Sequence, residues 1–570
     1  MRSPSRPLAA VVGVVVAAGL LSSVPGPARA LDVDASTSAA RTPAAAAAPR
    51  STAAERQVAR VATPRLRWER CGQGLPPNLA KRLTCATPKV PLDYDRPRGA
   101  PTQLFVARLR AEQPARRIGT LFVNPGGPGG SAAGAILDFA SALGPRVRAR
   151  FDVVGVDPRG VGGSGITACS GKVGFPPRLA QYPLNREQAT SRIRFDDRVR
   201  RACAQKRTPL VDHASTADVA RDMDLIRRAV GDPKLTYYGV SYGSYLGATY
   251  ARLFPNKVRA LVVDAVLDPV AWSTGNPTTQ GAKTPFTTRL RSGYGAYEAL
   301  TAAWTECDRV GKKRCALAGD ALGKWKRVLR AAKQGRLGDG NGSLAYQDVV
   351  GIALGSLYSR FGIPSLASFV ADLNAGLDRS ARTGQRRVLV SESKQYPKLL
   401  KMRRELERRG LYTAPIVSAP ARRPATTDVL FNAVTCSDSV NPRDPYAWER
   451  AAKEQDRTAP WFGRLWTWSS SPCARQGIGS SDDAFQGPWR TGTSTPLLVV
   501  GNTHDPATPI SGARKVNTRF RDSVLLTWDG WGHAAIGQGG CVTSLTGTYL
   551  VTQQLPDDGT VCRQPKPLFR

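Results

Sequence analysis

Short apolar runs alternate with amphipathic stretches through the first half of the chain. Buried strands are expected at four of these runs, residues 119–124, 151–157, 235–240 and 258–264. Apolar positions at helical spacing in residues 215–230 and 242–253 flank the third run and predict helices there. Strands that alternate with helices are typical of βαβ units, so the pattern predicts an α/β protein with a mainly parallel sheet and helices on both faces.

The alternation stops after the fourth strand and returns only late in the chain. The intervening residues are helix-like and irregular and contain several tryptophans, which favours a mainly helical cap inserted over the C-terminal edge of the sheet. Strands are expected again at 496–501 and 523–528, followed by a helix at 541–550. The predicted layout is a core at residues 66–270, the cap at 271–493 and the rest of the core at 494–570.

The first 65 residues are expected to lie outside the folded core. Residues 1–30 have a basic start, a short apolar stretch and the cleavage pattern Ala28-Arg29-Ala30, which together predict a secretory signal peptide. Residues 31–65 are rich in Ala, Thr, Ser and Pro and predict a disordered linker or pro-segment. No later apolar run reaches the roughly 18 residues that a membrane span needs, so a secreted protein without a stable membrane span is expected.

The charge of the chain is strongly positive. Its 570 residues include 81 Lys and Arg against 44 Asp and Glu, a formal net charge of +37. The basic residues are scattered and no nucleic-acid-binding motif accompanies them, so nucleic acid is not expected as a partner. The partner that this charge suggests is an anionic cell envelope or wall, to which the protein would bind electrostatically.

The ten cysteines fit an exported protein with five disulfides. Proximity in the sequence suggests the pairs Cys71–Cys85, Cys169–Cys203, Cys307–Cys315, Cys436–Cys473 and Cys541–Cys562. No C-x-x-C pair occurs and the chain has only three histidines, so neither a zinc site nor any other metal or cofactor is expected.

The nucleophile is predicted at Ser241, in the sequence Gly239-Val240-Ser241-Tyr242-Gly243. This fits G-x-S-x-G between a strand and a helix, the setting in which a sharp turn exposes the serine oxygen. The two glycines remove side chains that would collide at the turn. The backbone N–H of Tyr242 starts the helix, where it would stabilise a developing oxyanion.

A serine hydroxyl needs a base, and only three histidines are available. We predict His533, which lies in a loop after a late strand, because His213 precedes the serine in the chain and His504 adjoins the best acid. That acid is Asp505, just after the strand at 496–501. Ser241, Asp505 and His533 then follow the chain order of hydrolase triads, with the acid orienting the imidazole.

These motifs together resemble the secreted actinobacterial tripeptidyl aminopeptidases, α/β-hydrolases related to prolyl aminopeptidases. The resembling stretches are VNPGGPGGS (123–131), DPRGVGGS (157–164), GVSYGSYLGATYARLFP (239–255), GNTHDPATP (501–509) and GWGH (530–533). The resemblance implies the α/β-hydrolase fold and places the N–H of Gly127 beside that of Tyr242 in the oxyanion hole. Pro125 stands where prolyl aminopeptidases have a histidine, which argues against proline specificity.

An aminopeptidase must also hold the substrate's free amino terminus, usually with carboxylates. Asp438 in the predicted cap is the first candidate, and Asp264 and Glu392 are the alternatives.

The expected function is a secreted serine peptidase that releases short peptides, tripeptides first, from free N-termini through an acyl-enzyme. The alternative is a secreted carboxylesterase or lipase with the same triad. A non-catalytic basic protein that binds the cell surface is a third hypothesis, against which an intact triad argues.

Overall fold

The computed structural model describes residues 51–71, 74–170, 182–338, 344–408, 426–475, 477–490 and 492–570. These described residues form one compact unit. The predicted signal peptide and most of the predicted linker lie outside the described residues. No helix in the part that is described is long and apolar enough to cross a membrane.

The end of the predicted linker is a helix rather than a disordered segment. Helix α1 (Ala53–Ala59) begins with a capping box between Thr52 and Glu55, and it buries Ala54 and Val58, one helical turn apart. The hydroxyl of Thr52 donates to the carbonyl of Leu253 at 2.5 Å. The prediction of disorder is therefore wrong for residues 53–59. Two apolar positions and a capping box are sufficient to stabilise a short helix when the folded protein offers a surface for it to pack against.

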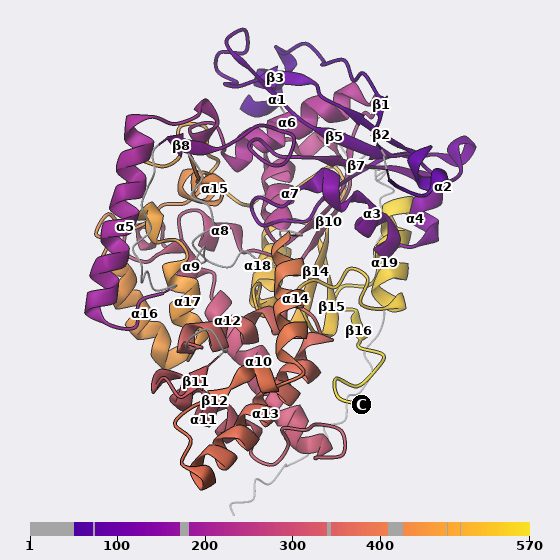
Figure 1. Ribbon diagram of the computed structural model, residues 1–570. Helices are drawn as coiled ribbons and strands as arrows, with labels where there is room; N and C mark the ends of the chain where they lie inside the picture. The colour runs from indigo at the N-terminus through magenta and orange to yellow at the C-terminus, as the bar shows by residue number, and fades with distance from the viewer. Residues whose placement is uncertain are drawn as a thin grey trace, which may run out of the picture. The chain divides into compact units, whose positions relative to one another are not determined.

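A ten-stranded sheet forms the centre of the unit (Figure 1). Its strands in spatial order are β1 (Glu69–Arg70), β2 (Leu83–Ala86), β5 (Val106–Leu109), β7 (Phe151–Val156), β6 (Gly119–Asn124), β9 (Leu235–Val240), β10 (Val258–Asp264), β14 (Leu498–His504), β15 (Val524–Trp531) and β16 (Val561–Arg563). Pairing is parallel from β7 to β16 and antiparallel from β1 to β7. The six predicted strands are all present, and the last two run several residues further than predicted.

Helices cover both faces of this sheet. Helices α3 (Ala132–Ala142), α4 (Pro145–Arg150) and α19 (Gly540–Thr552) pack on one face, and α6 (Thr216–Ala229), α7 (Tyr242–Leu253) and α18 (Ile510–Arg519) pack on the other. Successive strand residues alternate between the two cores, so that Tyr237 faces α6 and α7 whereas Tyr238 faces α3. Burial on both faces explains why the strands read as continuous apolar runs.

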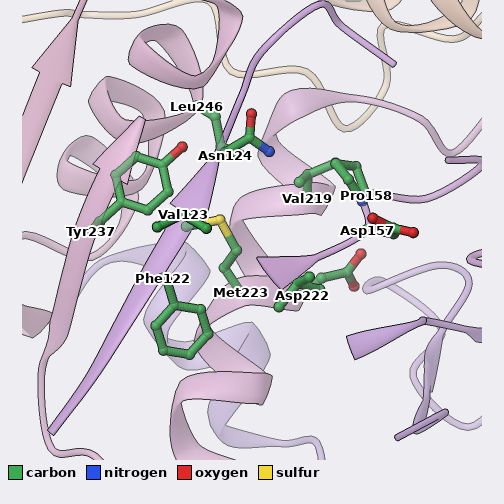
Figure 2. Close-up of a pocket in the computed structure, with 11 residues that line it drawn as sticks. Phe122, Val123, Asn124, Asp157, Pro158, Val219, Asp222, Met223, Tyr237 and Leu246 are labelled. Atoms are coloured by element: carbon green, nitrogen blue, oxygen red, sulfur yellow. The ribbon is translucent and has the colours of Figure 1, made fainter. Parts of the chain in front are cut away.

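A small hollow lies between β6, β9 and α6 (Figure 2). Both carboxylates in its lining already have protein donors. Asp222 accepts hydrogen bonds from the Arg159 guanidinium at 2.6 Å and the Tyr94 hydroxyl at 2.7 Å, and Asp157 accepts one from the Ser131 hydroxyl at 2.7 Å. We therefore interpret the hollow as part of the core packing that supports the loop after β6, and not as a ligand site.

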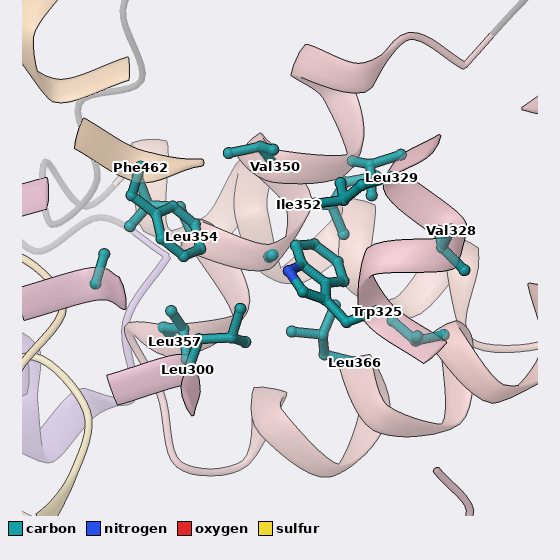
Figure 3. Packing of buried hydrophobic residues seen from close by; sticks show 14 of the residues in the cluster. Leu300, Trp325, Val328, Leu329, Val350, Ile352, Leu354, Leu357, Leu366 and Phe462 are labelled. Atoms are coloured by element: carbon teal, nitrogen blue, oxygen red, sulfur yellow. The ribbon is translucent and has the colours of Figure 1, made fainter. Parts of the chain in front are cut away.

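The chain between β10 and β14 is mainly helical in the described residues. Its helices are α8 (Pro269–Trp272), α9 (Phe286–Arg289), α10 (Ser292–Val310), α11 (Ala321–Lys333), α12 (Tyr346–Leu357), α13 (Gly362–Thr383), α14 (Tyr396–Arg408), α15 (Leu430–Asp438), α16 (Ala447–Thr458) and α17 (Phe462–Trp468). Helices α10 to α14, α16 and α17 enclose a separate core in which Trp325 packs among Leu300, Leu329 and Leu366 (Figure 3), whereas α8, α9 and α15 bury their apolar residues in the core beside α6 and α7. This region corresponds to the predicted cap.

The cap also takes in a helix from before the predicted nucleophile. Helix α5 (Arg186–Gln205) buries Ala189 and Ile193 in the cap core, and the Ser471 hydroxyl donates to its Asp196 at 2.6 Å. The predicted bounds of the core include this stretch, because nothing in its local pattern distinguishes a cap helix from a crossover helix.

All five predicted disulfide pairings are confirmed, and each closes a short loop of the chain. Cys541–Cys562 joins α19 to the edge strand β16, and Cys436–Cys473 joins two parts of the cap.

Candidate active site

Ser241 lies at the turn between β9 and α7 with a φ of 58° and a ψ of −121°. A positive φ is costly for a residue with a side chain, so the surrounding structure must enforce it. A Cβ atom added at Gly239 would lie 2.2 Å from the carbonyl oxygen of Gly243, and one added at Gly243 would lie 2.7 Å from that of Asn124. Both glycines of the motif are therefore required by close backbone contacts, as the sequence predicts.

The loop after β6 passes directly over this turn. A Cβ atom at Gly126 would lie 2.8 Å from the Cβ of Ser241 and 2.9 Å from the backbone nitrogen of Tyr242. The next residue, Gly127, lines the same cavity as Ser241. Tyr242 is the first residue of α7, where backbone N–H groups lack partners within the helix. The two residues predicted to form an oxyanion hole thus adjoin the predicted nucleophile.

The predicted acid and base form a buried pair. The Nδ1 atom of His533 lies 2.9 and 3.0 Å from the two carboxylate oxygens of Asp505. Asp505 is held in turn by the backbone N–H groups of Ala507, Thr508 and Ala534, at 2.9, 2.8 and 3.2 Å. With Nδ1 on the carboxylate, Nε2 is the ring nitrogen left to act as a base.

One cavity is lined both by Ser241 and by residues that contact this pair. It measures about 520 Å³ including its open mouth and is lined by Gly127, Ser241, Leu267, Trp272, Phe286, Thr287, Leu290, Ser292, Tyr358, Phe431, Trp466, Ser469, Ala507 and Thr508. His533 stands directly behind two of these residues. Its Nδ1 lies 3.4 Å from the hydroxyl of Thr508, and its ring packs edge-on against that of Tyr358 with the centroids 5.0 Å apart.

The chain is similar to known proteins over most of its length. The family described as "alpha/beta hydrolase fold" matches residues 119–284, and the family described as "TAP-like protein" matches residues 459–562. Serine protease Hip1 of Mycobacterium bovis is 31% identical over 532 residues, which is 88% of this chain and 93% of that protein. The chain belongs to the tripeptidyl aminopeptidase family of α/β-hydrolases.

Other relatives have the same extent of similarity. A tripeptidyl aminopeptidase of Streptomyces lividans is 29% identical over 514 residues, 88% of each chain. A protein of Mycobacterium tuberculosis named carboxylesterase B is 29% identical over 520 residues, 88% of this chain and 91% of that one. The predicted family and the α/β-hydrolase fold are thereby confirmed, and this member of the tripeptidyl aminopeptidase family is a serine hydrolase.

The other two histidines of this family member are engaged elsewhere. Nδ1 of His504 lies 2.9 Å from a carboxylate oxygen of Glu298 on α10, and its ring stacks on Trp531. Nδ1 of His213 lies 3.8 Å from Asp483, and that carboxylate raises the pKa of His213. None of the three histidines is among the described residues that line the cavity with Ser241, but the ring of His533 contacts Thr508 and Tyr358, which do line it.

Asp438, the predicted anchor for the amino terminus, is buried beside the site and is 1% exposed. Its carboxylate accepts hydrogen bonds from the backbone N–H and the hydroxyl of Thr216, at 2.9 and 2.6 Å, and from the indole N–H of Trp272 at 3.4 Å. Burial raises its pKa to about 7. Asp438 is not among the described residues that line the cavity, whereas its partner Trp272 is. Its other partner, Thr216, also lies 2.6 Å from the Tyr242 hydroxyl.

The two alternative carboxylates lie in other surroundings. Asp264 accepts from the backbone N–H groups of Ala535 and Ile536 at 3.0 and 2.9 Å, which fixes the loop after His533, and burial raises its pKa to about 6. Glu392 is about half exposed and pairs with Arg379.

Two residues around His533 were not predicted from the sequence. Thr508 follows Asp505 by three positions, and the hydrogen bonds from the following N–H groups to an aspartate are an Asx-turn pattern that the sequence Asp-Pro-Ala-Thr could have indicated. Tyr358 belongs to the cap, far from the triad in the chain, and its carbonyl accepts the backbone N–H of His533 at 3.0 Å. No local signal points to it.

Proposed function

We propose that this protein is a secreted serine peptidase that releases short peptides, tripeptides first, from free N-termini of polypeptides. The observation that carries the proposal is the single cavity shared by Ser241, Gly127 and the residues in front of the His533–Asp505 pair. The names of the relatives, tripeptidyl aminopeptidase and serine protease, support peptide substrates. The five disulfides support an oxidising compartment outside the cell, and the charge of +37 supports electrostatic association with an anionic envelope.

The proposed reaction follows from the roles of the named groups. The hydroxyl of Ser241 attacks the scissile carbonyl while Nε2 of His533 takes its proton, and the imidazolium that forms is stabilised by Asp505. The oxyanion of the tetrahedral intermediate is held by the backbone N–H groups of Gly127 and Tyr242. His533 then protonates the departing amine, and an acyl-enzyme on Ser241 remains. Water activated by His533 hydrolyses that ester and frees the N-terminal peptide.

The cavity favours apolar residues in the released peptide. Aromatic and aliphatic side chains form most of its wall, hydroxyls supply the polar part, and none of the described lining residues carries a charged side chain. An ionised side chain buried there would lose its water without gaining a counterion. A tripeptide amide with methionine beside the scissile bond should therefore have a kcat/KM at least about tenfold above that of its lysine counterpart of similar length.

Steady-state hydrolysis of this matched pair of substrates, and of a leucine and aspartate pair, measures that preference. Equal rates, or a preference for lysine, would contradict the assignment of this cavity to the acyl side of the substrate.

The free amino terminus is the feature that separates an exopeptidase from an esterase or an endopeptidase. Asp438 remains our proposed anchor, because it contacts the indole of Trp272 in the cavity wall. Acetylation would remove the cationic partner of this buried carboxylate, at a cost on the order of 2–5 kcal/mol. Since each 1.36 kcal/mol is tenfold in rate, kcat/KM for the acetylated substrate should fall by about 30-fold or more.

The experiment compares free and N-acetylated forms of one peptide pool, with products identified by mass spectrometry, on the wild type and on Asp438→Asn. Tripeptides released from the free pool alone support the proposal, and an Asp438→Asn enzyme that treats both pools alike supports the anchor. A preference for free amines that survives Asp438→Asn discards only the anchor residue. Equal cleavage of both pools by the wild type would overturn the exopeptidase.

A carboxylesterase or lipase is the second candidate function. The relative named carboxylesterase B favours it, because the same triad and oxyanion hole cleave esters. Hydrolysis of short-chain esters without any peptide cleavage would establish it in place of the peptidase.

A further inference from the structure

A wide recess lies behind part of the cavity wall, and the same short segments line both. In the segment around α8, Leu267 and Trp272 line the cavity with Ser241, whereas Asp268 and Ala271 line the recess. The segment around α9 alternates in the same way. Thr287 and Leu290 line the cavity, and Thr288 and Arg291 line the recess.

We call this hollow the basic recess. It is lined by Asp268, Val270, Ala271, Asn276, Gln280, Thr284, Thr288, Arg289, Arg291, Arg490, Lys515, Thr518 and Arg519, and it encloses about 1340 Å³ of empty space including its open mouth. Most of the polar lining groups can donate hydrogen bonds. Five of the lining side chains are basic and one is acidic, so the recess has a large excess of positive charge.

The single carboxylate in the lining is already neutralised. One oxygen of Asp268 lies 3.0 Å from the ammonium of Lys515, and the other lies 3.7 Å from the guanidinium of Arg519. Lys515 and Arg519 stand one turn apart on α18, so both reach the same side of that helix. The charges of Arg291 and Arg490, which are exposed, are left without this compensation.

Arg289 forms the back of the basic recess and is a buried cation whose hydrogen-bond partners are all neutral. It is 7% exposed, and its five N–H donors all go to main-chain carbonyls, those of Ala271, Trp272, Ser273, Thr284 and Val440. Burial lowers its pKa to about 10, so it stays charged at neutral pH. Because all of its N–H donors already have acceptors, Arg289 contributes positive electrostatic potential to the recess but no hydrogen bond to a ligand.

We propose that the basic recess is a binding site for an anion that carries several phosphate charges. Arg291, Arg490 and Lys515 would donate to its oxygens. A single carboxylate would leave most of this positive charge unbalanced, whereas an oligophosphate or a phosphodiester polymer matches it. The site is separate from the chemistry at Ser241 and does not depend on the proposed peptidase function.

The test is calorimetric titration of the full chain with sodium tripolyphosphate in about 150 mM salt, where weak surface attraction is largely screened. The variant R291Q/R490Q/K515Q removes three cations from the recess and leaves Arg289 and Arg519 to hold the fold. The matched control, K312Q/K313Q/R314Q, removes three exposed cations from the cap. We expect saturable binding to the wild type and the control within about twofold of each other, and binding at least about tenfold weaker in the recess variant.

The proposal is overturned if the wild type shows no saturable binding, or if the two triple variants lose affinity equally. Should the recess variant fail to fold, the single change R490Q at an exposed position decides the matter, because it must weaken tripolyphosphate binding while R314Q does not. The source of the phosphate is distinguished by a second titrant. A glycerol phosphate polymer that competes with tripolyphosphate supports an envelope polymer as the ligand, and tripolyphosphate binding without such competition supports a free oligophosphate.

Discussion

Replacing Ser241 by alanine is expected to lower kcat by about 10³-fold or more on any substrate the wild type cleaves. The change deletes the oxygen that forms the acyl-enzyme and leaves the turn, its two glycines and the overlying loop untouched. The thermal midpoint should accordingly stay close to that of the wild type. Steady-state kinetics with a titrated enzyme, together with thermal unfolding, measure both quantities.

A Ser241→Ala protein that is stable and still turns over at more than a few per cent of the wild-type rate would show that the nucleophile is elsewhere. If the protein is inactive and its thermal midpoint is much lower, the activity is lost because the protein unfolds. The prediction of an unchanged fold would then be wrong, and the assignment of the nucleophile would not be contradicted.

The second large effect is expected at His533. His533→Ala should lower kcat by about the same factor as Ser241→Ala, because without the base the hydroxyl keeps its proton. The matched control is His213→Ala, which removes an imidazole that pairs with Asp483. The control should retain most of the activity. An active His533→Ala enzyme alongside an inactive His213→Ala enzyme would reverse the assignment of the base.

Because the two groups act as one unit, their losses should not add. The double variant Ser241→Ala, His533→Ala is expected to be about as slow as either single variant. Losses that multiply would indicate that His533 contributes to the rate independently of Ser241.

The sheet and the nucleophile turn could be predicted because the signals for them are local. A strand buried on both faces is a continuous apolar run, and β6, β9 and β10 have the predicted bounds. The glycines around Ser241 are fixed by contacts within the same strand–turn–helix unit and the neighbouring strand, with the carbonyl of Gly243 only 2.2 Å from a Cβ at Gly239. Chain order and strand context likewise selected Asp505 and His533 from a small set.

The cap could be predicted as a region but not in its internal arrangement. Helix α5 joins it through contacts such as the bond from Ser471 to Asp196, which are remote in sequence. Asp438 shows the same limit. Its residue type suggested a role in binding a cation, but its burial beneath Trp272 and Thr216 depends on three separate segments that meet only in the folded protein.

The most direct test of the central claim is covalent labelling. A serine-directed phosphonate should modify the wild type once, and tandem mass spectrometry of the digested protein should place the adduct on Ser241. The Ser241→Ala protein should remain unlabelled under the same conditions, and the labelled wild type should lose its activity in proportion to the adduct. An adduct on any other residue, or equal labelling of the Ser241→Ala protein, would contradict the account.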